Sequence, residues 1–286
     1  MYSQKTKKSE LPKMKEIKLI CTDIDGTLLN DKKRMNSYDK EMLKRAYEER
    51  NIPTILTSGR FKAGLVNIQE ELGFPTGISC FNGSYVELDN KVIKDIRIEL
   101  SDLERVIPII MNNNSYPIIY DLHKAYMNDR GYWYDVQEKI TTGSAVEAPL
   151  MNLLKDWENN KYSPFKILAK DNNYENLLNT KRLIDAANIK GINTFLSSPV
   201  ILEIVPKGIS KASTVNIMCD SLNIDTDNVM SFGDYNNDIE LIAASGYGIA
   251  MDNAVPAVKA VAFTVTDNNN NNGIGKAIKK YIFKEE

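Results

Sequence analysis

The stretch KLICTDIDGTLLN, residues 18–30, decides how this chain is interpreted. It is apolar up to Cys21 and then places Asp23 and Asp25 two positions apart, directly before a glycine. Side chains two apart on an extended segment point the same way and lie about 6.6 Å apart, from a rise of about 3.3 Å per residue. Two carboxylates at the end of a buried strand repel each other and resist burial unless a ligand or cation completes the site. This stretch therefore predicts a functional strand end.

The composition is typical of a soluble globular protein with one large domain or a domain that carries an insertion. The chain has 286 residues, 43% of them apolar, and its 36 basic and 38 acidic residues give a net charge of −2. Such a balance creates no overall field for nucleic acid or anionic lipid, so an anionic substrate must be captured locally. The polar first 16 residues indicate no signal peptide, and no later run approaches the roughly 18 apolar residues of a membrane span.

The cysteines and the histidine exclude several kinds of site. Cys21, Cys80 and Cys219 are widely spaced and form no CxxC pair. This spacing argues against a disulfide framework or a zinc site and favours a cytoplasmic location. His123 is the single histidine and lies far from the other motifs, so neither a histidine-based triad nor a multi-histidine metal site is expected.

Short β-rich runs alternate with helical patterns at both ends of the chain, which is typical of a parallel sheet covered by helices. Strands are expected at 17–23, 52–57, 78–81, 228–232, 247–251 and 261–265. Helices are expected around 42–47, where apolar residues recur at helical spacing, and between Gly59 and Gly73. A further helix is expected after Ser210, whose side chain is predicted to cap it.

The middle of the chain, residues 87–199, has a different pattern. It mixes strand-like pieces such as YPIIYDL and FKILAK with helices near 101–112 and 174–188. Because the alternation stops before this segment and resumes after it, we expect an inserted α+β domain between two parts of an α/β core, 1–86 and 200–286. Near the end, the tract DNNNNNG at 267–273 is predicted to be a tolerated surface loop.

Four polar clusters follow the predicted strands or begin the helices beside them: DIDGT, TSGR, GISK and GDYNND. In sheets of this type, ligands bind outside the carboxyl ends of the strands. The clusters supply four carboxylates, which would repel one another strongly without a cation: Asp23, Asp25, Asp234 and Asp238. Oxygen ligands of this kind favour Mg²⁺, which typically binds one or two carboxylates together with a substrate phosphate.

The same clusters supply groups that bind a phosphate. Ser58 and Gly59 offer a hydroxyl and backbone N–H groups close to a helix N-terminus, and Lys211 adds a fixed positive charge. Carboxylates, a cation, amides and a lysine together predict a phosphoryl-transfer site. The segment GISKAST lacks the GxxxxGK[ST] spacing of a nucleotide P-loop, so a kinase or ATPase is not expected.

The ordered motifs DIDGTLL, TSGR, GISK and GDYNNDIEL resemble those of the haloacid dehalogenase (HAD) superfamily. Their spacing is similar to that of its Cof-type, subfamily IIB, sugar phosphatases with a C2-type cap. The resemblance covers nearly the whole chain and implies a Rossmann-like core with an α+β cap inserted between the second and third motifs. It also implies an Mg²⁺-dependent phosphatase of small phosphorylated metabolites. Ser58 stands where threonine is commoner, and the asparagine tract replaces a more acidic loop.

The resemblance also implies a role for each motif residue. Asp23 is expected to be the nucleophile that forms an aspartyl-phosphate, and Asp25 the general acid and base. The expected Mg²⁺ ligands are Asp23, the backbone carbonyl of Asp25 and Asp234, with Asp238 supporting the metal or the lysine. The phosphate oxygens are expected to contact the Ile24 amide, Ser58, Gly59, Lys211 and Asn237.

Other interpretations stay open on the sequence alone. Asp25-Gly26 is by itself an ordinary turn signal, and Asp238 can serve a helix dipole. A sugar phosphomutase would use the same nucleophile and acid, and a phosphometabolite sensor would bind the same ligands without turnover.

Substrate specificity is expected to come from the inserted domain. Tyr120, Asp121, Tyr126, Trp133 and Lys166 are its candidate contacts, although most aromatic residues of such a domain belong to its core. The NGS sequon at 82–84 is not expected to be a glycosylation site, because no secretion signal is visible, and the family resemblance implies a turn near the site entrance there. The sequence names neither the physiological substrate nor the oligomeric state.

Overall fold

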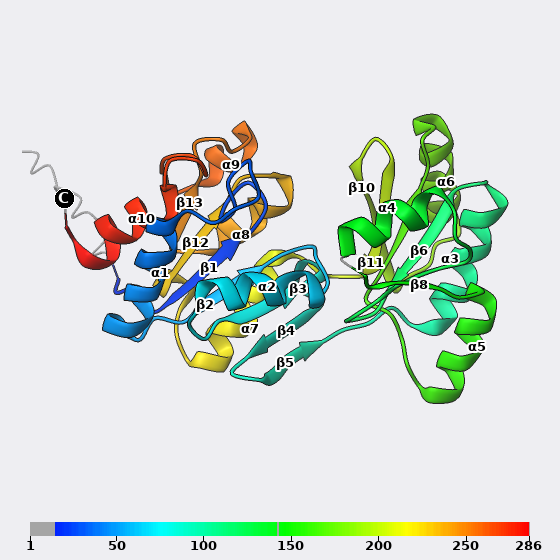
Figure 1. The fold of residues 1–286 in the computed structure, drawn as a ribbon, viewed down its shortest axis with the longest axis horizontal. Coiled ribbons are helices and arrows are strands. Elements are labelled where there is room, and N and C mark those ends of the chain that lie inside the picture. The colour runs from blue at the N-terminus through cyan, green and yellow to red at the C-terminus, as the bar shows by residue number, and fades with distance from the viewer. Residues whose placement is uncertain (1–14, 142, 286) are drawn as a thin grey trace, which may run out of the picture.

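The computed structural model describes residues 15–141 and 143–285, which form two sheets covered by helices (Figure 1). The segment 1–14, which holds most of the stretch predicted to lack a signal peptide, lies outside the described residues. The larger sheet is built from β1 (Leu19–Asp23), β2 (Thr54–Thr57), β3 (Gly77–Cys80), β4 (Tyr85–Leu88), β5 (Lys91–Asp95), β12 (Val229–Gly233), β13 (Tyr247–Ala250) and β14 (Thr264–Val265). Its strand order is β14-β13-β12-β1-β2-β3-β4-β5.

The larger sheet is parallel from β14 to β3, and an antiparallel pair, β4 and β5, extends its edge. Its helices are α1 (Ser37–Arg50), α2 (Ala63–Leu72), α7 (Lys211–Leu222), α8 (Ile239–Ala244), α9 (Pro256–Val261) and α10 (Gly273–Ile278). Every residue of β1 is buried, as expected for a strand covered on both faces. Successive residues pack to opposite sides: Ile20 joins the cluster that contains Met42 of α1, whereas Cys21 joins the cluster that contains Val215 of α7.

The smaller sheet comes from the middle of the chain. It contains β6 (Tyr116–Tyr120), β7 (Ala125–Met127), β8 (Ala145–Glu147), β9 (Lys166–Lys170), β10 (Ile192–Ser198) and β11 (Ile201–Pro206), in the order β10-β11-β9-β6-β7-β8. Its helices are α3 (Leu100–Asn112), α4 (Tyr132–Thr141), α5 (Leu150–Asn160) and α6 (Tyr174–Ala186). Helices α3, α5 and α6 lie on the side of this sheet that faces away from the larger one (Figure 1). The predicted α/β core with an inserted α+β domain is thus confirmed.

The sheet pairings move both expected boundaries of the insertion. Strands β4 and β5 pair within the larger sheet, so the boundary expected after residue 86 falls inside β4. Strand β11 pairs with β9 and β10, so the boundary expected after residue 199 falls between two strands of the smaller sheet. The chain passes between the sheets at 96–99 and again at 207–210, and we refer to the part between these crossings as the cap.

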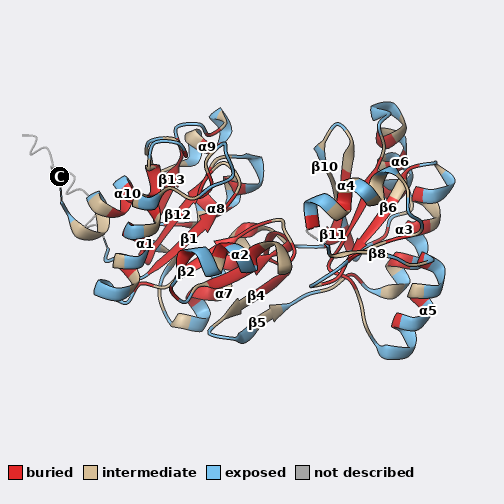
Figure 2. Cartoon of the chain, viewed as in Figure 1, coloured by how far each residue is buried: buried red, intermediate tan, exposed pale blue. Residues whose placement is uncertain are grey.

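The cap and the core share buried aromatic contacts. Phe81, just after β3, stacks on Phe165, just before β9, with ring centroids 5.0 Å apart and planes inclined by 5°. Phe61 packs against Tyr120 of β6 at 6.0 Å. Buried residues are concentrated in the strands of both sheets, and the outer helix faces are exposed (Figure 2).

Two local expectations differ from the structure. The strand expected at 261–265 is reduced to β14, because Pro256 begins α9 and the helix continues to Val261. Ser210 stands at the N-cap of α7, but its side chain makes no capping hydrogen bond; its carbonyl instead accepts one from Ser213 Oγ (2.7 Å).

The asparagine tract is more than a tolerated surface loop. Asn269 is buried, and its Nδ2 donates to Leu29 O (3.1 Å) and to Asp31 Oδ1 (3.1 Å). Asn270 Nδ2 donates to the other carboxylate oxygen of Asp31 (3.0 Å), and Asn36 Nδ2 donates to Asn269 O (2.8 Å). The tract therefore fastens the loop that follows the DIDGT motif.

The cysteines are free and buried, in agreement with the expectation against a disulfide framework. Among the residues that the structure describes, no helix is both long enough and apolar enough to cross a membrane.

Candidate active site

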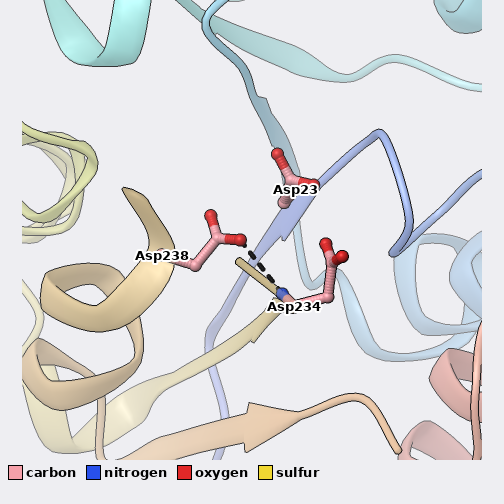
Figure 3. Close-up of side chains that lie close together, drawn as sticks. All are labelled: Asp23, Asp234 and Asp238. Carbon is pink, nitrogen blue, oxygen red and sulfur yellow. Dashed lines mark hydrogen bonds between the residues drawn. The ribbon is translucent and has the colours of Figure 1, made fainter. Parts of the chain in front are cut away.

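Three of the four predicted carboxylates converge at the carboxyl ends of two adjacent parallel strands. Asp23 is the last residue of β1, and Asp234 directly follows β12, which pairs with β1. Asp238 lies at the start of α8, and ligand oxygens of the three side chains lie within 4.8 Å of one another (Figure 3). Gly26 makes this packing possible, since at its φ of +86° a Cβ would lie only 2.4 Å from Asp234 Oδ2.

Lys211 lies between two of these carboxylates. Its Nζ is 2.5 Å from Asp23 Oδ1 and 2.6 Å from Asp238 Oδ1, and its side chain is 0% exposed. Burial alone lowers the pKa of an ammonium, but Asp23 and Asp238 hold the pKa of Lys211 above its ordinary value. Lys211 is therefore a buried cation held in place by two acids.

Asp238 uses both of its carboxylate oxygens within the protein. Oδ1 accepts from Lys211, and Oδ2 accepts the backbone N–H groups of Asp234 (3.0 Å) and Tyr235 (3.1 Å). The dashed line in Figure 3 marks the bond to Asp234. Asp238 thus fixes both Lys211 and the loop that carries Asp234.

Asp23 and Asp234 have the properties of a site for a hard divalent cation. Burial raises the pKa of Asp23 to about 7, although the Lys211 ammonium opposes the rise. Burial likewise raises the pKa of Asp234 to about 6, against the hydrogen bond from Thr27 Oγ1 (2.8 Å). Among the described residues, none donates a hydrogen bond to Oδ2 of Asp23 or to Oδ2 of Asp234. Two accessible carboxylate oxygens crowded together fit a cation such as Mg²⁺.

Asp25 lines a pocket with Asp23 and Asp234 but does not belong to this cluster of three carboxylates. Arg60 clamps it with two hydrogen bonds, from Nε to Oδ2 (2.8 Å) and from Nη2 to Oδ1 (2.7 Å), and Lys33 Nζ lies 3.0 Å from Oδ1. Burial alone would raise the pKa of this carboxyl, but Arg60 and Lys33 hold the pKa of Asp25 below its ordinary value. In this conformation Asp25 is an ionised carboxylate in a basic clamp.

The TSGR motif forms a tight turn after β2. Ser58 N donates to Ser79 O (2.8 Å), while Ser58 Oγ accepts from Arg60 N (3.1 Å). A Cβ on Gly59 would lie 3.3 Å from Asn82 Oδ1, and this oxygen also accepts from Asn237 Nδ2 (3.5 Å). The turn therefore lies next to the GDYNND loop. Ile24 is fully buried, so its side chain is not available to a ligand.

These residues line one pocket of about 390 Å³. Its lining comprises Asp23, Asp25, Ser58, Gly59, Arg60, Glu203, Asp234, Tyr235 and Asn237. Lys211 lies beneath it, in contact with Asp23. All four sequence motifs thus meet at one place.

The candidate cap contacts separate into two groups. Lys166 lies next to the pocket, since its Nζ donates to Gly59 O (2.9 Å), and Tyr120 packs at the cap–core interface. The Asp121 carboxylate accepts hydrogen bonds from the Tyr126 hydroxyl (2.7 Å) and from two backbone N–H groups of a turn. Asp121 and Tyr126 therefore serve the structure of the cap. Trp133 packs on Tyr132 and under Lys170, and it does not line this pocket.

Several site residues were not given a role by the sequence analysis. Thr27 and Arg60 lie inside quoted motifs, and Asn82 lies inside the NGS turn at a left-handed φ of 57° that asparagine tolerates. For Lys33 and Glu203 the sequence carries no local signal, because the tertiary fold sets the direction of the loop that brings Lys33 to Asp25 and of the strand that brings Glu203 to the pocket.

Comparison with known proteins agrees with this geometry. A family model described as haloacid dehalogenase-like hydrolase matches residues 20–278. The 5-amino-6-(5-phospho-D-ribitylamino)uracil phosphatase of Bacillus subtilis is 26% identical over 267 residues, which cover 93% of this chain and 96% of that protein. A solved haloacid dehalogenase-like hydrolase from Bacteroides thetaiotaomicron has a TM-score of 0.82 at 26% identity and covers 93% of this chain and 99% of its own. A solved HAD subclass IIB sugar phosphatase shares the fold, with a TM-score of 0.74 at 22% identity over 92% of this chain and 98% of its own.

Proposed function

This chain belongs to the haloacid dehalogenase-like hydrolases and is a phosphatase of small phosphorylated molecules, and from that premise we propose that it hydrolyses sugar or polyol monophosphates with Mg²⁺ through a phosphoenzyme on Asp23. The observation that carries the proposal is the buried ammonium of Lys211, 2.5 Å from Asp23 and 2.6 Å from Asp238. A carboxylate is a useful nucleophile only when cations withdraw charge from the phosphoryl group that it attacks.

In the proposed first step, an oxygen of Asp23 attacks phosphorus and the bond between phosphorus and the ester oxygen breaks. Lys211 holds the carboxylate through Oδ1, and Oδ2 accepts no hydrogen bond from the described residues. Ser58, Gly59 and Asn237, which line the pocket, would contact the phosphoryl oxygens together with the Ile24 amide. The product of this step is an aspartyl-phosphate and an alkoxide that needs a proton.

Asp25 would supply that proton. Because Arg60 and Lys33 keep it ionised in this conformation, Asp25 must leave the clamp and take up a proton before it acts as an acid. Arg60 lines the same pocket, so a bound phosphate would compete with Asp25 for the guanidinium and release it. In the second step Asp25 would accept a proton from water as the water attacks phosphorus, which breaks the bond to Asp23 and frees inorganic phosphate.

Mg²⁺ would be held by Asp23, Asp234 and the backbone carbonyl of Asp25. Bound there, the ion would neutralise charge on the phosphoryl group and keep it in line with Asp23. Asp238 is better suited to hold Lys211 than to bind the metal, because both of its oxygens already accept hydrogen bonds. The cap would keep bulk water out of the pocket.

The substrate class is inferred from the pocket and from one relative. The Bacillus subtilis protein that is 26% identical is named for a phosphorylated ribitylamino compound, which is a polyol phosphate. A pocket of about 390 Å³ is of the size that accommodates such a small ligand. The free, buried cysteines support work in a reducing compartment such as the cytoplasm.

The test is phosphate release from a panel of sugar, polyol and nucleotide monophosphates and p-nitrophenyl phosphate, with and without MgCl₂. We expect Asp23→Asn to abolish phosphate release. Asp234→Asn should need an Mg²⁺ concentration about tenfold or more higher than wild type for half-maximal activity. Asp252→Asn is the matched control, because Asp252 is 63% exposed and lies outside the pocket. Equal release from wild type and Asp23→Asn would contradict the proposed nucleophile. Isomerised substrate with little free phosphate, after a bisphosphate is added, would favour the phosphomutase.

A further inference from the structure

Glu203 brings a carboxylate from the cap into the catalytic pocket. On β11 its neighbours Leu202 and Ile204 point into the cluster shared with the cap helices, so the strand period of two turns Glu203 to the opposite face. That face also carries Leu168 and Ile118, which belong to the cluster shared with the core. Among the described residues that line the pocket, Glu203 is the one contributed by the cap sheet.

The Glu203 side chain has no hydrogen-bond donor within the described residues. Its Oε2 is fully buried without a partner, and the side chain as a whole is 15% exposed. Lys166 Nζ lies 3.6 Å from Oε2 but donates its hydrogen bond to Gly59 O (2.9 Å). A buried carboxylate without donors is costly, and native structures keep such groups for a reason. Because Oε2 is closed off from solvent, Oε1, which also accepts no hydrogen bond from the described residues, is the oxygen to which a ligand would donate.

The position of the pocket indicates which ligand atoms these are. A phosphoryl group placed at Asp23 leaves the rest of the substrate directed toward the cap, where Glu203 lies in the same pocket. A carboxylate accepts hydrogen bonds from hydroxyl groups and repels a second anion. The nearby cations offset that repulsion only in part: Lys166, 3.6 Å from Oε2, and Lys170 lie outside the pocket lining, and Arg60, which lines the pocket, is paired with Asp25.

We propose that Glu203 is the specificity-determining residue of the pocket: it accepts hydrogen bonds from hydroxyls of the leaving group and selects uncharged, polyhydroxylated leaving groups over those that carry a second anion. This inference rests on the proposed phosphatase mechanism and adds its substrate selectivity. It also disfavours the phosphomutase, whose bisphosphate would place a second phosphate against Glu203.

The test compares matched substrate pairs in which a terminal CH2OH group is replaced by a carboxylate: glycerol 3-phosphate with 3-phosphoglycerate, and sorbitol 6-phosphate with 6-phosphogluconate. kcat/KM is measured for wild type, Glu203→Gln and Glu203→Ala, with p-nitrophenyl phosphate as a substrate that lacks hydroxyls. Glu175→Gln is the matched control, because Glu175 is an exposed residue in the first turn of α6.

We expect Glu203→Gln to raise the ratio of kcat/KM for the acidic substrate to kcat/KM for its neutral partner by about tenfold or more. The repulsion of the second anion is lost in this variant, whereas the amide oxygen still accepts a hydrogen bond. Glu203→Ala should lower kcat/KM for the neutral substrates by about tenfold or more, because a hydrogen bond to a charged group is lost. For p-nitrophenyl phosphate, which offers no hydroxyl group to Glu203, the loss of kcat/KM in Glu203→Ala should be smaller than the loss for the neutral hydroxylated substrates.

The outcomes separate this inference from the proposed function. If wild type hydrolyses p-nitrophenyl phosphate in an Asp23-dependent manner but Glu203→Gln leaves the ratio unchanged, the role of Glu203 is overturned and the phosphatase mechanism stands. If wild type releases no phosphate from any substrate, the mechanism itself fails and the role of Glu203 fails with it. A shift of the same size in Glu175→Gln would also overturn the inference.

Discussion

Replacing Lys211 with methionine tests the charge arrangement of the site directly. Methionine keeps much of the length of the lysine stem but removes the ammonium that lies between Asp23 and Asp238. The two carboxylates left behind are 9% and 1% exposed, so water cannot replace the lost charge. We therefore expect a large loss of stability that depends on pH.

The size of the loss follows from the burial of the group. Removing one partner of a buried ion pair costs about 3–5 kcal/mol, because it leaves an uncompensated charge. Burial already raises the pKa of Asp23 to about 7, above an unfolded value of about 3.9, so its ionisation destabilises the folded state as pH rises between these values. Without Lys211 this effect grows. The loss should reach about 3–5 kcal/mol at pH 8 and fall below about 2 kcal/mol at pH 5, where protons replace the missing cation.

Urea unfolding of the full chain in the presence of chelator measures this loss. Far-ultraviolet circular dichroism follows the whole chain, whereas tryptophan fluorescence follows the cap, because both tryptophans, Trp133 and Trp157, lie on cap helices. The circular dichroism transition should move to lower urea while the fluorescence transition moves much less. Lys44→Met is the matched control. Lys44 lies on α1, outside the cap, its side chain is 45% exposed, and a surface ion pair such as the one it forms with Glu48 contributes about 0.2–1 kcal/mol.

Three results would refute the reasoning. One is a loss under about 1 kcal/mol at pH 8, which would mean that the pair contributes no more than a surface contact. Another is a loss of the same size at pH 5 and pH 8, which would show that protonation of Asp23 does not offset the missing ammonium. The third is a loss in Lys44→Met that equals that of Lys211→Met.

Two further predictions concern residues around the site. Arg60→Met removes two hydrogen bonds that hold the pKa of Asp25 low, so the limb of the pH profile of kcat/KM that reports Asp25 should move to higher pH. An unchanged profile, or the same movement in the exposed control Arg130→Met, would contradict this role of Arg60. Asn269→Ala removes the hydrogen-bond donors to Leu29 O and Asp31, and it should lower the free energy of unfolding in urea by about 1–3 kcal/mol. Asn271→Ala, at an exposed position of the same tract, is the control and should have little effect.

The sequence predicted the core because its strands carry strong local signals. The run before Asp23 is continuously apolar, as a strand covered on both faces must be, and the structure buries all of β1. In the helix expected after Ser210, the apolar residues Val215, Met218 and Cys219 recur at helical spacing, and the structure buries all three on α7. The cap was harder, since α4 buries only Gln137 and Thr141 and so has no apolar stripe for a pattern to find.

The partners of the site residues could not be predicted from the sequence. Asp25 is bound by Arg60, 35 positions away, and that choice depends on how two loops approach each other. Asp238 had two open roles, and only the positions of Lys211 and of the two backbone N–H groups favour one of them. Asn269 belongs to a tract whose amides suit solvent and buried carbonyls equally well, so only its place beside Leu29 shows that it is a structural residue.

The pairing of β1 with β12 has a consequence for biosynthesis. Asp23 is made early, whereas Lys211, which neutralises it, lies 188 positions later, and the complete cap is translated between them. Long-range pairings of this kind form late, because the intervening chain must first be brought together. During translation the cap can fold as a contiguous unit while β1 still lacks a neighbour on one side. With the proposed mechanism, a growing chain on the ribosome therefore has no complete catalytic site, and no phosphatase activity, until the segment through Asp238 has emerged.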